Sequence, residues 1–379
     1  MIASLSSRSN YSTLDDFVYL NQASLGLISR RSILEMHKFL DDVARHGNSK
    51  MTDDDEVEFL DSLGSKASSL FNCSKENLGI LSSASEMLNQ LPYLILPNKK
   101  SKVILVSTDF PALYRPWLAY SERNKFKLKF VEDKENKDLT ETIINCLCKD
   151  TSAVVVSHVQ FSTGSKIDVV RLRRLTKRFN TKLIVDVTQA AGALVIDSKI
   201  WNCDAIVCSG YKWLGGHGGV GLAVLSEELI SKTPLTPGWM GAENPFSISH
   251  KYLSLSKTAR RFTQATMSYV SIKGLEVSIK ELLEMKVQNI EKHSKDLKTI
   301  FLGKLKDTSW NVFHDKIIDL SSSNIICISN DKKNLKEVSN LLFQNNIVCS
   351  YRNNHLRISI AHFNNENDIE KLFNLLGGL

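Results

Sequence analysis

Along the first part of the chain, hydrophobic residues recur among polar ones at helical spacing. Further along, the hydrophobic residues gather in short runs. Apolar residues recur at helical spacing across 30–45 and again across 54–71, which predicts amphipathic helices there. Beyond them, mostly apolar runs alternate with helix-like or polar segments; the runs are KVILVS (102–107), SAVVVSHV (152–159), KLIVDV (182–187), AIVCSG (205–210) and GLAVLS (221–226). This alternation predicts an α/β fold with a mainly parallel central sheet covered on both faces.

The pattern changes after the Pro- and Gly-rich segment TPLTPGWMGAENPF (233–246). A long helical stretch is expected at 268–306, followed by strands at 325–329, 347–351 and 356–360 and helices at 332–345 and 366–376. These elements predict a smaller C-terminal α+β domain. We therefore divide the chain into an N-terminal segment (1–30), a large domain (31–245) and a small domain (246–379).

Composition and charge argue against several classes of function for this chain. The 379 residues are 42% hydrophobic and 23% charged, with a net charge of +7. The lysines are scattered among acidic residues, which disfavours nucleic-acid binding. No apolar stretch approaches the ~20 residues that cross a bilayer. The N-terminus also lacks the apolar core of a signal peptide, so we expect no membrane partner and a cytoplasmic location. The seven cysteines lack metal-site spacing, and we expect no metal.

The stretch SGYKWLGGHGGVG (209–221) raises two hypotheses. Its glycines satisfy G-x-G-x-x-G, but a dinucleotide site needs a helix after the glycines, and here the strand-like LAVLS follows. The second hypothesis is that Lys212 forms a Schiff base with pyridoxal phosphate. Burial among apolar and aromatic groups would disfavour the ammonium form and make the amine reactive.

A carboxylate at the right place supports the second hypothesis. Asp186 ends the run KLIVD, and a crossover to the next strand would bring it to the same sheet edge as Lys212. An acid there keeps the pyridine ring protonated, so that it accepts electrons from a substrate. Gln189, at an expected helix start, could donate to the phenolic oxygen of the ring. The alternative is that Asp186 only caps that helix.

A phosphate group needs a cradle of donors. The segment LSSASEMLNQL (81–91) places small residues before a helix, whose N-terminus attracts anions. It is also an ordinary capping sequence. Ser209 supplies a further hydroxyl near Lys212.

The stretch VDVTQAAGALVID…DAIVCSGYKWLGGHGGVG closely resembles the class V aminotransferases, a branch of the fold-type I pyridoxal phosphate enzymes. YLNQASLGLISRR (19–31), ARRFTQAT (259–266) and IVCSYRNNHLRISIAHFNNENDI (347–369) resemble further family elements, so the resemblance covers nearly the whole chain. It implies pyridoxal 5'-phosphate as cofactor, a small amino acid as substrate, and a homodimer with shared active sites.

The resemblance also implies roles for individual residues. Lys212 and Asp186 would be catalytic, and Arg357 and Asn21 would bind the substrate, with Arg357 taking its carboxylate. The other cofactor contacts would be Ala84, Ser85, Phe110, Gln189, Ser209, Tyr211 and Thr266, the last from the other subunit. Trp239 would line the entrance. Taken alone, Phe110 could be a core aromatic and Arg357 an edge-strand surface residue.

Departures from the family pattern limit the reaction. A desulfurase needs a nucleophilic cysteine on a loop before the arginine, and here Cys349 lies within an expected strand. We therefore expect transamination or a C–S or C–C lyase reaction. Cysteine desulfurase or selenocysteine lyase is the alternative within this chemistry, and a non-catalytic protein of the same fold is the alternative from another class.

Overall fold

The computed structural model describes residues 1–378 except 48, 249, 307, 316 and 317. Within these residues, a seven-stranded sheet has the order β2-β8-β7-β6-β5-β3-β4. Its strands are β2 (Leu78–Leu81), β3 (Lys102–Val106), β4 (Lys127–Val131), β5 (Thr151–Ser157), β6 (Lys182–Asp186), β7 (Ala205–Ser209) and β8 (Gly221–Leu225). Strand β8 is antiparallel to both its neighbours, β2 and β7, and the other neighbouring strands are parallel. The prediction of a mainly parallel sheet is confirmed.

Helices cover both faces of this sheet because its strands are apolar on both sides. Along β5, Val154 and Val156 belong to one core cluster, whereas Ala153 and Val155 belong to another, as expected when successive side chains point to opposite faces. On the first face lie α3 (Asp53–Phe71), α6 (Leu139–Ile144), α7 (Val169–Arg178) and α10 (Tyr269–Met285); on the second lie α4 (Ala84–Ile95) and α5 (Pro111–Asn124). The short helices α8 (Ser198–Trp201) and α9 (Glu227–Ile230) follow later strands.

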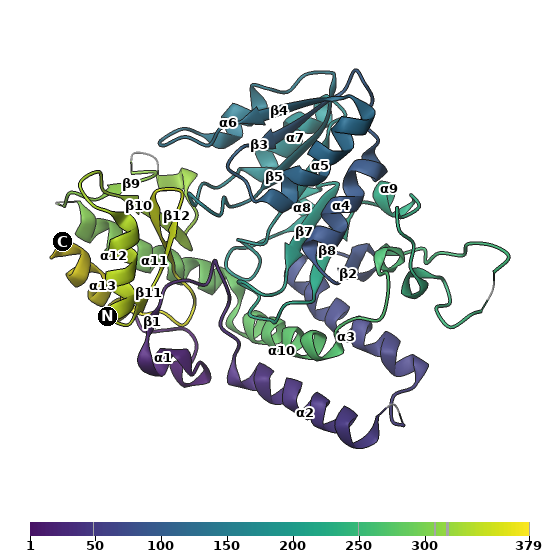
Figure 1. The fold of residues 1–379 in the computed structure, drawn as a ribbon, viewed down its shortest axis with the longest axis horizontal. Helices are drawn as coiled ribbons and strands as arrows, with labels where there is room; N and C mark the ends of the chain where they lie inside the picture. Colours follow the sequence, from purple (N-terminus) through teal and green to yellow (C-terminus); the bar gives the residue numbers. More distant parts are fainter. Residues whose placement is uncertain (48, 249, 307, 316–317, 379) are drawn as a thin grey trace.

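The C-terminal part forms a second, smaller layer beside the large sheet (Figure 1). Its antiparallel sheet has the order β12-β13-β10-β9. The strands are β9 (Asn311–Val312), β10 (Ile325–Ser329), β12 (Ser350–Arg352) and β13 (His355–Ser359), and the helices are α11 (Val287–Leu305), α12 (Leu335–Gln344) and α13 (Glu366–Gly377). The run predicted as one strand at 347–351 is divided between β11 (Ile347–Val348) and β12, with Cys349 at the break.

The helix predicted at 268–306 is interrupted. Lys286 has a φ of 64°, a left-handed conformation that a continuous helix does not contain, so α10 ends before it and α11 begins after it. The buried Ile272 and Leu275 of α10 share the core of the large sheet. The predicted domain boundaries stay a prediction. Because α10 packs on the large sheet, we place residues 269–285 with that sheet and not with the small domain.

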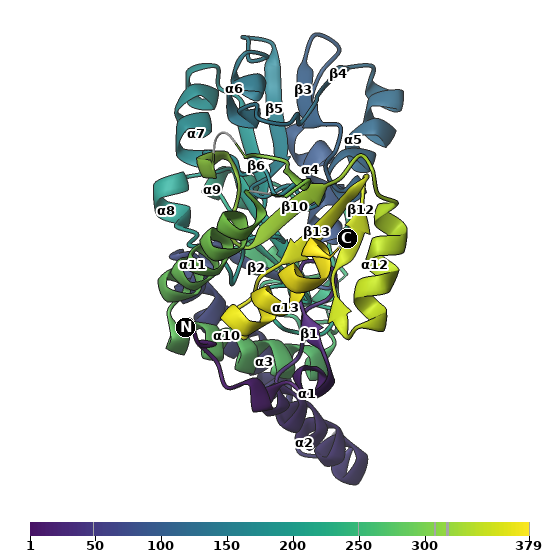
Figure 2. The ribbon, with the colours of Figure 1, turned by 90° about the vertical axis from the view of Figure 1, so that its left-hand side faces the viewer.

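The N-terminal segment connects the two parts. After α1 (Thr13–Asp16), strand β1 (Val18–Tyr19) pairs with β11 of the small sheet. Helix α2 (Arg30–His46) then extends beyond the rest of the fold, as Figures 1 and 2 show. In the described part of the chain, every helix is too short or too polar to cross a bilayer.

Candidate active site

Several predicted site residues gather at the carboxyl edge of the large sheet, where open α/β sheets bind ligands. Asp186 ends β6 and Ser209 ends β7, and these adjacent strands are parallel, with Asp186 paired to Val207. Lys212 follows in the turn after β7. The glycines beyond it lead into β8, so the strand that argued against a dinucleotide site is confirmed.

The Lys212 side chain is buried among aromatic rings. It is 8% exposed, and its Nζ lies 5.4 Å from the ring centroid of Phe110 and 5.8 Å from that of Tyr211. Burial lowers the pKa of Lys212 to about 8, although the negative charge of Asp186 raises it. Because only the neutral amine is nucleophilic, Lys212 is more reactive near neutral pH than an exposed lysine.

The N-terminal segment holds the backbone around Lys212. Gln22 Nε2 donates to the Lys212 carbonyl at 3.0 Å, and the Gly26 amide donates to the Tyr211 carbonyl at 2.9 Å. A Cβ on Gly26 would lie 2.0 Å from the Lys212 carbonyl oxygen. Only glycine permits this close approach, which explains the glycine of YLNQASLG.

Asp186 is a buried carboxylate at the end of β6. Burial raises its pKa to about 6; hydrogen bonding to Thr188 lowers it, and the negative charge of Asp109 raises it. Its Oδ1 accepts from the Thr188 amide at 2.7 Å. The expected helix start is wrong, because residues 188–190 form a turn. Asp186 therefore braces a turn, and the alternative that it caps a helix fails.

Gln189 has protein partners on both sides of its amide. Its Nε2 donates to the Ala23 carbonyl at 3.1 Å, and its Oε1 accepts from Trp213 Nε1 at 2.8 Å. These bonds tie the turn after β6 to the N-terminal segment. A second N–H of the amide is left for a ligand, and the predicted bond to the phenolic oxygen stays a prediction.

Phe110 lies at the start of α5, facing the site. It is 43% exposed, so the alternative that it is a core aromatic is wrong. Its ring meets that of Phe161 edge to face, with the centroids 5.6 Å apart. Together with the contact to Lys212, this exposure leaves the ring free to cover a flat ligand.

The N-terminus of α4 opens toward the same edge. Ser83 caps the helix, accepting from the Glu86 amide at 3.2 Å, so the capping interpretation is correct. Ala84 and Ser85 begin the helix, where amides have no intrahelical partner. A Cβ on Gly221 would lie 2.3 Å from the Ser83 carbonyl carbon. This glycine thus lets β8 approach the helix start, an end of a helix that attracts anions.

Arg357 comes from the small sheet and is almost fully buried. It lies on β13, between β12 and β10, and is 1% exposed, so the edge-strand alternative is wrong. Its Nη1 donates to the Phe161 carbonyl at 2.8 Å and its Nη2 to Ser24 Oγ at 2.6 Å. Burial lowers the pKa of Arg357 to about 10.

The surroundings of Arg357 lack a counter-charge. No carboxylate of the described residues lies within 4.0 Å of its guanidinium nitrogens, and its Nε has no hydrogen-bond partner among them. Asn21, whose backbone bridges to Ser359, has a buried Oδ1 that is likewise unpartnered in the described chain. A buried cation without an anion is costly, so this arrangement favours an anionic ligand.

Two predicted residues lie apart from this group. Thr266 is exposed, and Trp239 is 40% exposed and meets the ring of Phe246 edge to face. No hydrogen bond connects either side chain to the others across the described residues.

Sequence reasoning missed several residues of the site. Asp109 is buried behind Phe110, and Phe161 and Ser24 hold Arg357. Asp109 comes shortly after an apolar strand run, as Asp186 does, but no spacing to another candidate residue singled it out. No comparable pattern marked Phe161, because its contacts are long-range.

Two cysteines near Arg357 have raised pKa values. Burial raises the pKa of Cys349 to about 12 and that of Cys327, paired with Arg357 across the sheet, to about 12. A thiol with such a pKa is a poor nucleophile. Among the described residues, no cluster of three or more His, Cys, Asp or Glu could hold a metal ion.

Comparison with known proteins identifies similar chains. The profile of the family Aminotransferase class-V matches residues 18–372. An uncharacterized aminotransferase, YcbU of Bacillus subtilis, is 24% identical over 307 residues, 79% of this chain and 78% of the relative. A probable cysteine desulfurase of Mycoplasma genitalium is 24% identical over 319 residues, 81% of this chain and 78% of the relative.

Solved structures agree on the fold. The cysteine desulfurase CsdA from Escherichia coli superposes with a TM-score of 0.85 at 17% identity, covering 98% of this chain and 96% of that one. A mutant of C-DES with glycine covalently linked to its PLP cofactor gives 0.86 at 16% identity, covering 98% and 99%. The family match confirms the predicted family and, with it, the predicted pyridoxal phosphate dependence, and the solved structures confirm the predicted fold.

Proposed function

The chain belongs to the aminotransferase class-V family, and from this premise we propose that it acts on the Cα of a small amino acid by transamination or by C–S or C–C bond cleavage. One observation supports the substrate above all. Arg357 is a buried cation, and in the described chain it has no carboxylate within 4.0 Å of its guanidinium nitrogens. A small molecule with its own carboxylate would complete the site.

The residues present fit pyridoxal phosphate. Lys212 offers an amine, Asp186 a buried carboxylate, Phe110 an exposed ring face, and the α4 N-terminus an anion site. We propose that Ala84, Ser85, Ser209 and Tyr211 hold the phosphate and that Gln189 contacts the ring. When bound, the cofactor supplies an electron sink that stabilises negative charge at Cα.

Lys212 would move the proton. With a pKa lowered to about 8 by burial, a substantial fraction of the amine is neutral near physiological pH, so Nζ can accept a proton from Cα and return it. Asp186 would favour protonation of the pyridine nitrogen. Phe110 would exclude water from the face of the ring.

Arg357 would set the orientation of the substrate. A planar guanidinium forms paired hydrogen bonds with a carboxylate, which a lysine cannot reproduce. Phe161 and Ser24 already fix two of its nitrogens. We propose that Asn21 Oδ1, buried nearby and without a partner among the described residues, accepts a further hydrogen bond from the substrate.

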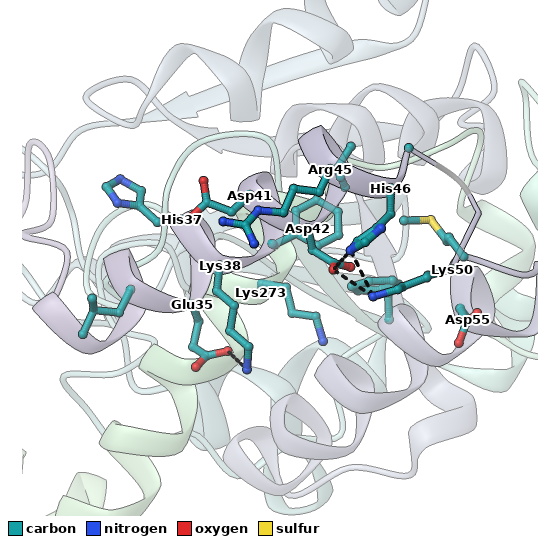
Figure 3. Close-up of a pocket in the computed structure, with 16 residues that line it drawn as sticks. Glu35, His37, Lys38, Asp41, Asp42, Arg45, His46, Lys50, Asp55 and Lys273 are labelled. Atoms are coloured by element: carbon teal, nitrogen blue, oxygen red, sulfur yellow. Dashed lines mark hydrogen bonds and ion pairs between the residues drawn. The ribbon is translucent and has the colours of Figure 1, made fainter.

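We propose that two copies of the chain form a dimer with shared sites. Helix α2 exposes Leu34 (66%) and Leu40 (50%). A cavity of about 840 Å³ lies along α2, α3 and Lys273. Figure 3 shows the charged side chains around it, including the Glu35–Lys38 and Asp42–His46 pairs. In a dimer, the exposed Thr266 could reach the phosphate of the other subunit and Trp239 its entrance.

A cytoplasmic location remains part of the proposal. All seven cysteines are free thiols, which suits a reducing compartment.

A cysteine desulfurase is the second candidate, favoured by the named relatives. Such a reaction needs a protein thiol near the substrate, and the pKa of Cys349 is raised to about 12 by burial. C–S cleavage without a protein nucleophile therefore fits this chain better than persulfide transfer.

A panel of small amino acids tests the proposal. Each is added to the holoprotein while the visible absorption of the cofactor is followed, and products are identified by mass. At least one amino acid should shift the band and be converted, and Arg357→Lys should raise KM by about 100-fold because paired hydrogen bonds are lost. A holoprotein that leaves every amino acid unconverted would favour the non-catalytic alternative.

A further inference from the structure

Asp109 is a buried acid that the proposed reaction does not use. It follows β3 at the carboxyl edge and is 4% exposed. In the described chain, no lysine, arginine or histidine nitrogen lies within 4.0 Å of it. Burying a carboxylate costs free energy unless hydrogen bonds satisfy it, so a buried acid at this position needs a reason.

Four donors satisfy both oxygens of Asp109. Oδ1 accepts from the Phe110 amide at 2.8 Å and from Ser157 Oγ at 2.6 Å. Oδ2 accepts from the Ser157 amide at 2.8 Å and from Gln160 Nε2 at 3.1 Å. The carboxylate therefore fastens the turn before α5 to the end of β5 and to the loop that follows.

That loop continues to the substrate arginine. Phe161 follows Gln160; its carbonyl accepts from Arg357 Nη1, and its ring meets the ring of Phe110. Asp109 thus contacts, directly or through one residue, the segment that carries Phe110 and the segment that holds Arg357. Phe110 lies on the large part of the fold and Arg357 on the small one.

Asp109 also lies beside the other acid of the site. Ser157, which gives it two hydrogen bonds, pairs across the sheet with Asp186. An amide in place of the carboxylate would be wrongly matched, because Asn offers one acceptor oxygen to four donors. The pattern of donors therefore specifies a carboxylate.

We propose that Asp109 is a positioning residue, which holds Phe110 and the 157–161 loop at a fixed separation so that the ring and Arg357 face one bound substrate. This inference rests on the proposed function. Asp109 itself contacts neither substrate nor cofactor in this proposal.

The test compares Asp109→Asn and Ser157→Ala with a matched control. Asp204 is also buried and hydrogen-bonded, but it precedes β7 and binds Arg173 and the Leu183 amide. Asp204→Asn should lower stability and leave the site unchanged. Visible circular dichroism of bound pyridoxal phosphate reports ring orientation, and steady-state kinetics with the best amino acid separates KM from kcat.

Asp109→Asn should change the visible circular dichroism by about twofold and raise KM about tenfold, because small misplacements of positioning groups have effects of this order. Ser157→Ala, which removes one of the four bonds, should show the same changes more weakly and serves if Asp109→Asn does not fold. Both should still bind the cofactor at Lys212.

Two results would overturn the inference. If Asp109→Asn and Ser157→Ala match the Asp204→Asn control in dichroism and KM, the acid has only a structural role, while the proposed function stands. If the unaltered protein does not bind pyridoxal phosphate at Lys212, the proposed function fails and this inference fails with it.

Discussion

At the scale of single residues, burial sets the chemistry of Lys212. Its pKa is about 8 in the folded chain and 10.5 in an ordinary lysine. Between these pH values, the unfolded apoprotein binds more protons than the folded one, so the Lys212 contribution to stability rises with pH. Below about pH 8, a buried ammonium destabilises the fold.

This rise of stability with pH gives a prediction for the apoprotein. Lys212→Met removes the buried charge and should be more stable than the parent by about 1–3 kcal/mol near pH 7. The difference should shrink as pH rises from about 8 toward 10.5. Urea unfolding at several pH values measures it, and a pH-independent difference would contradict the assignment.

Residue-level prediction from sequence located side chains correctly where they end or follow a strand, and the roles given to these residues stay proposals. Asp186 and Lys212 were found because polar groups stood out after apolar runs. Asp109 gives the same signal and was overlooked because no partner in the sequence pointed to it. Phe161 holds Arg357 through a backbone carbonyl. Every residue type has this carbonyl, so the sequence does not indicate such a contact.

At the scale of elements, close backbone approaches shape the proposed phosphate site. Gly221→Ala would place a Cβ 2.3 Å from the Ser83 carbonyl carbon, whereas a Cβ on Gly218 meets no atom within 4 Å. We expect Gly221→Ala to weaken pyridoxal phosphate binding by about tenfold or more, because α4 must shift. Gly218→Ala should bind as the parent does. Absorbance titration gives both dissociation constants, and equal values would contradict the role of α4.

The elements themselves were predicted with uneven success. Long apolar runs located β5, β6, β7 and β8, because strands buried on both faces need them. β4 was missed, since KLKFV alternates lysine with apolar residues and lies at the sheet edge. The break at Lys286 was also missed, because no glycine or proline marks it.

At the scale of the whole molecule, a single chain does not explain why α2 exposes apolar side chains. Sedimentation should give twice the 42.6 kDa mass of the chain. Leu34→Glu combined with Leu40→Glu should shift the protein toward monomer, because charges would replace the exposed apolar side chains of α2 at the interface. Ile200→Glu, at an equally exposed apolar residue of α8 (65%), is the control. A parent protein that sediments as a monomer would refute the dimer.

The most direct test of the central claim is to locate the cofactor on the chain. The holoprotein is reduced with borohydride and digested, and the modified lysine is identified by mass. Lys298 is an internal comparison, since burial also lowers its pKa to about 8 but its amine binds the Ser322 carbonyl. We expect the pyridoxyl group on Lys212 alone. A pyridoxyl group on Lys298 or another lysine, or none, would contradict it.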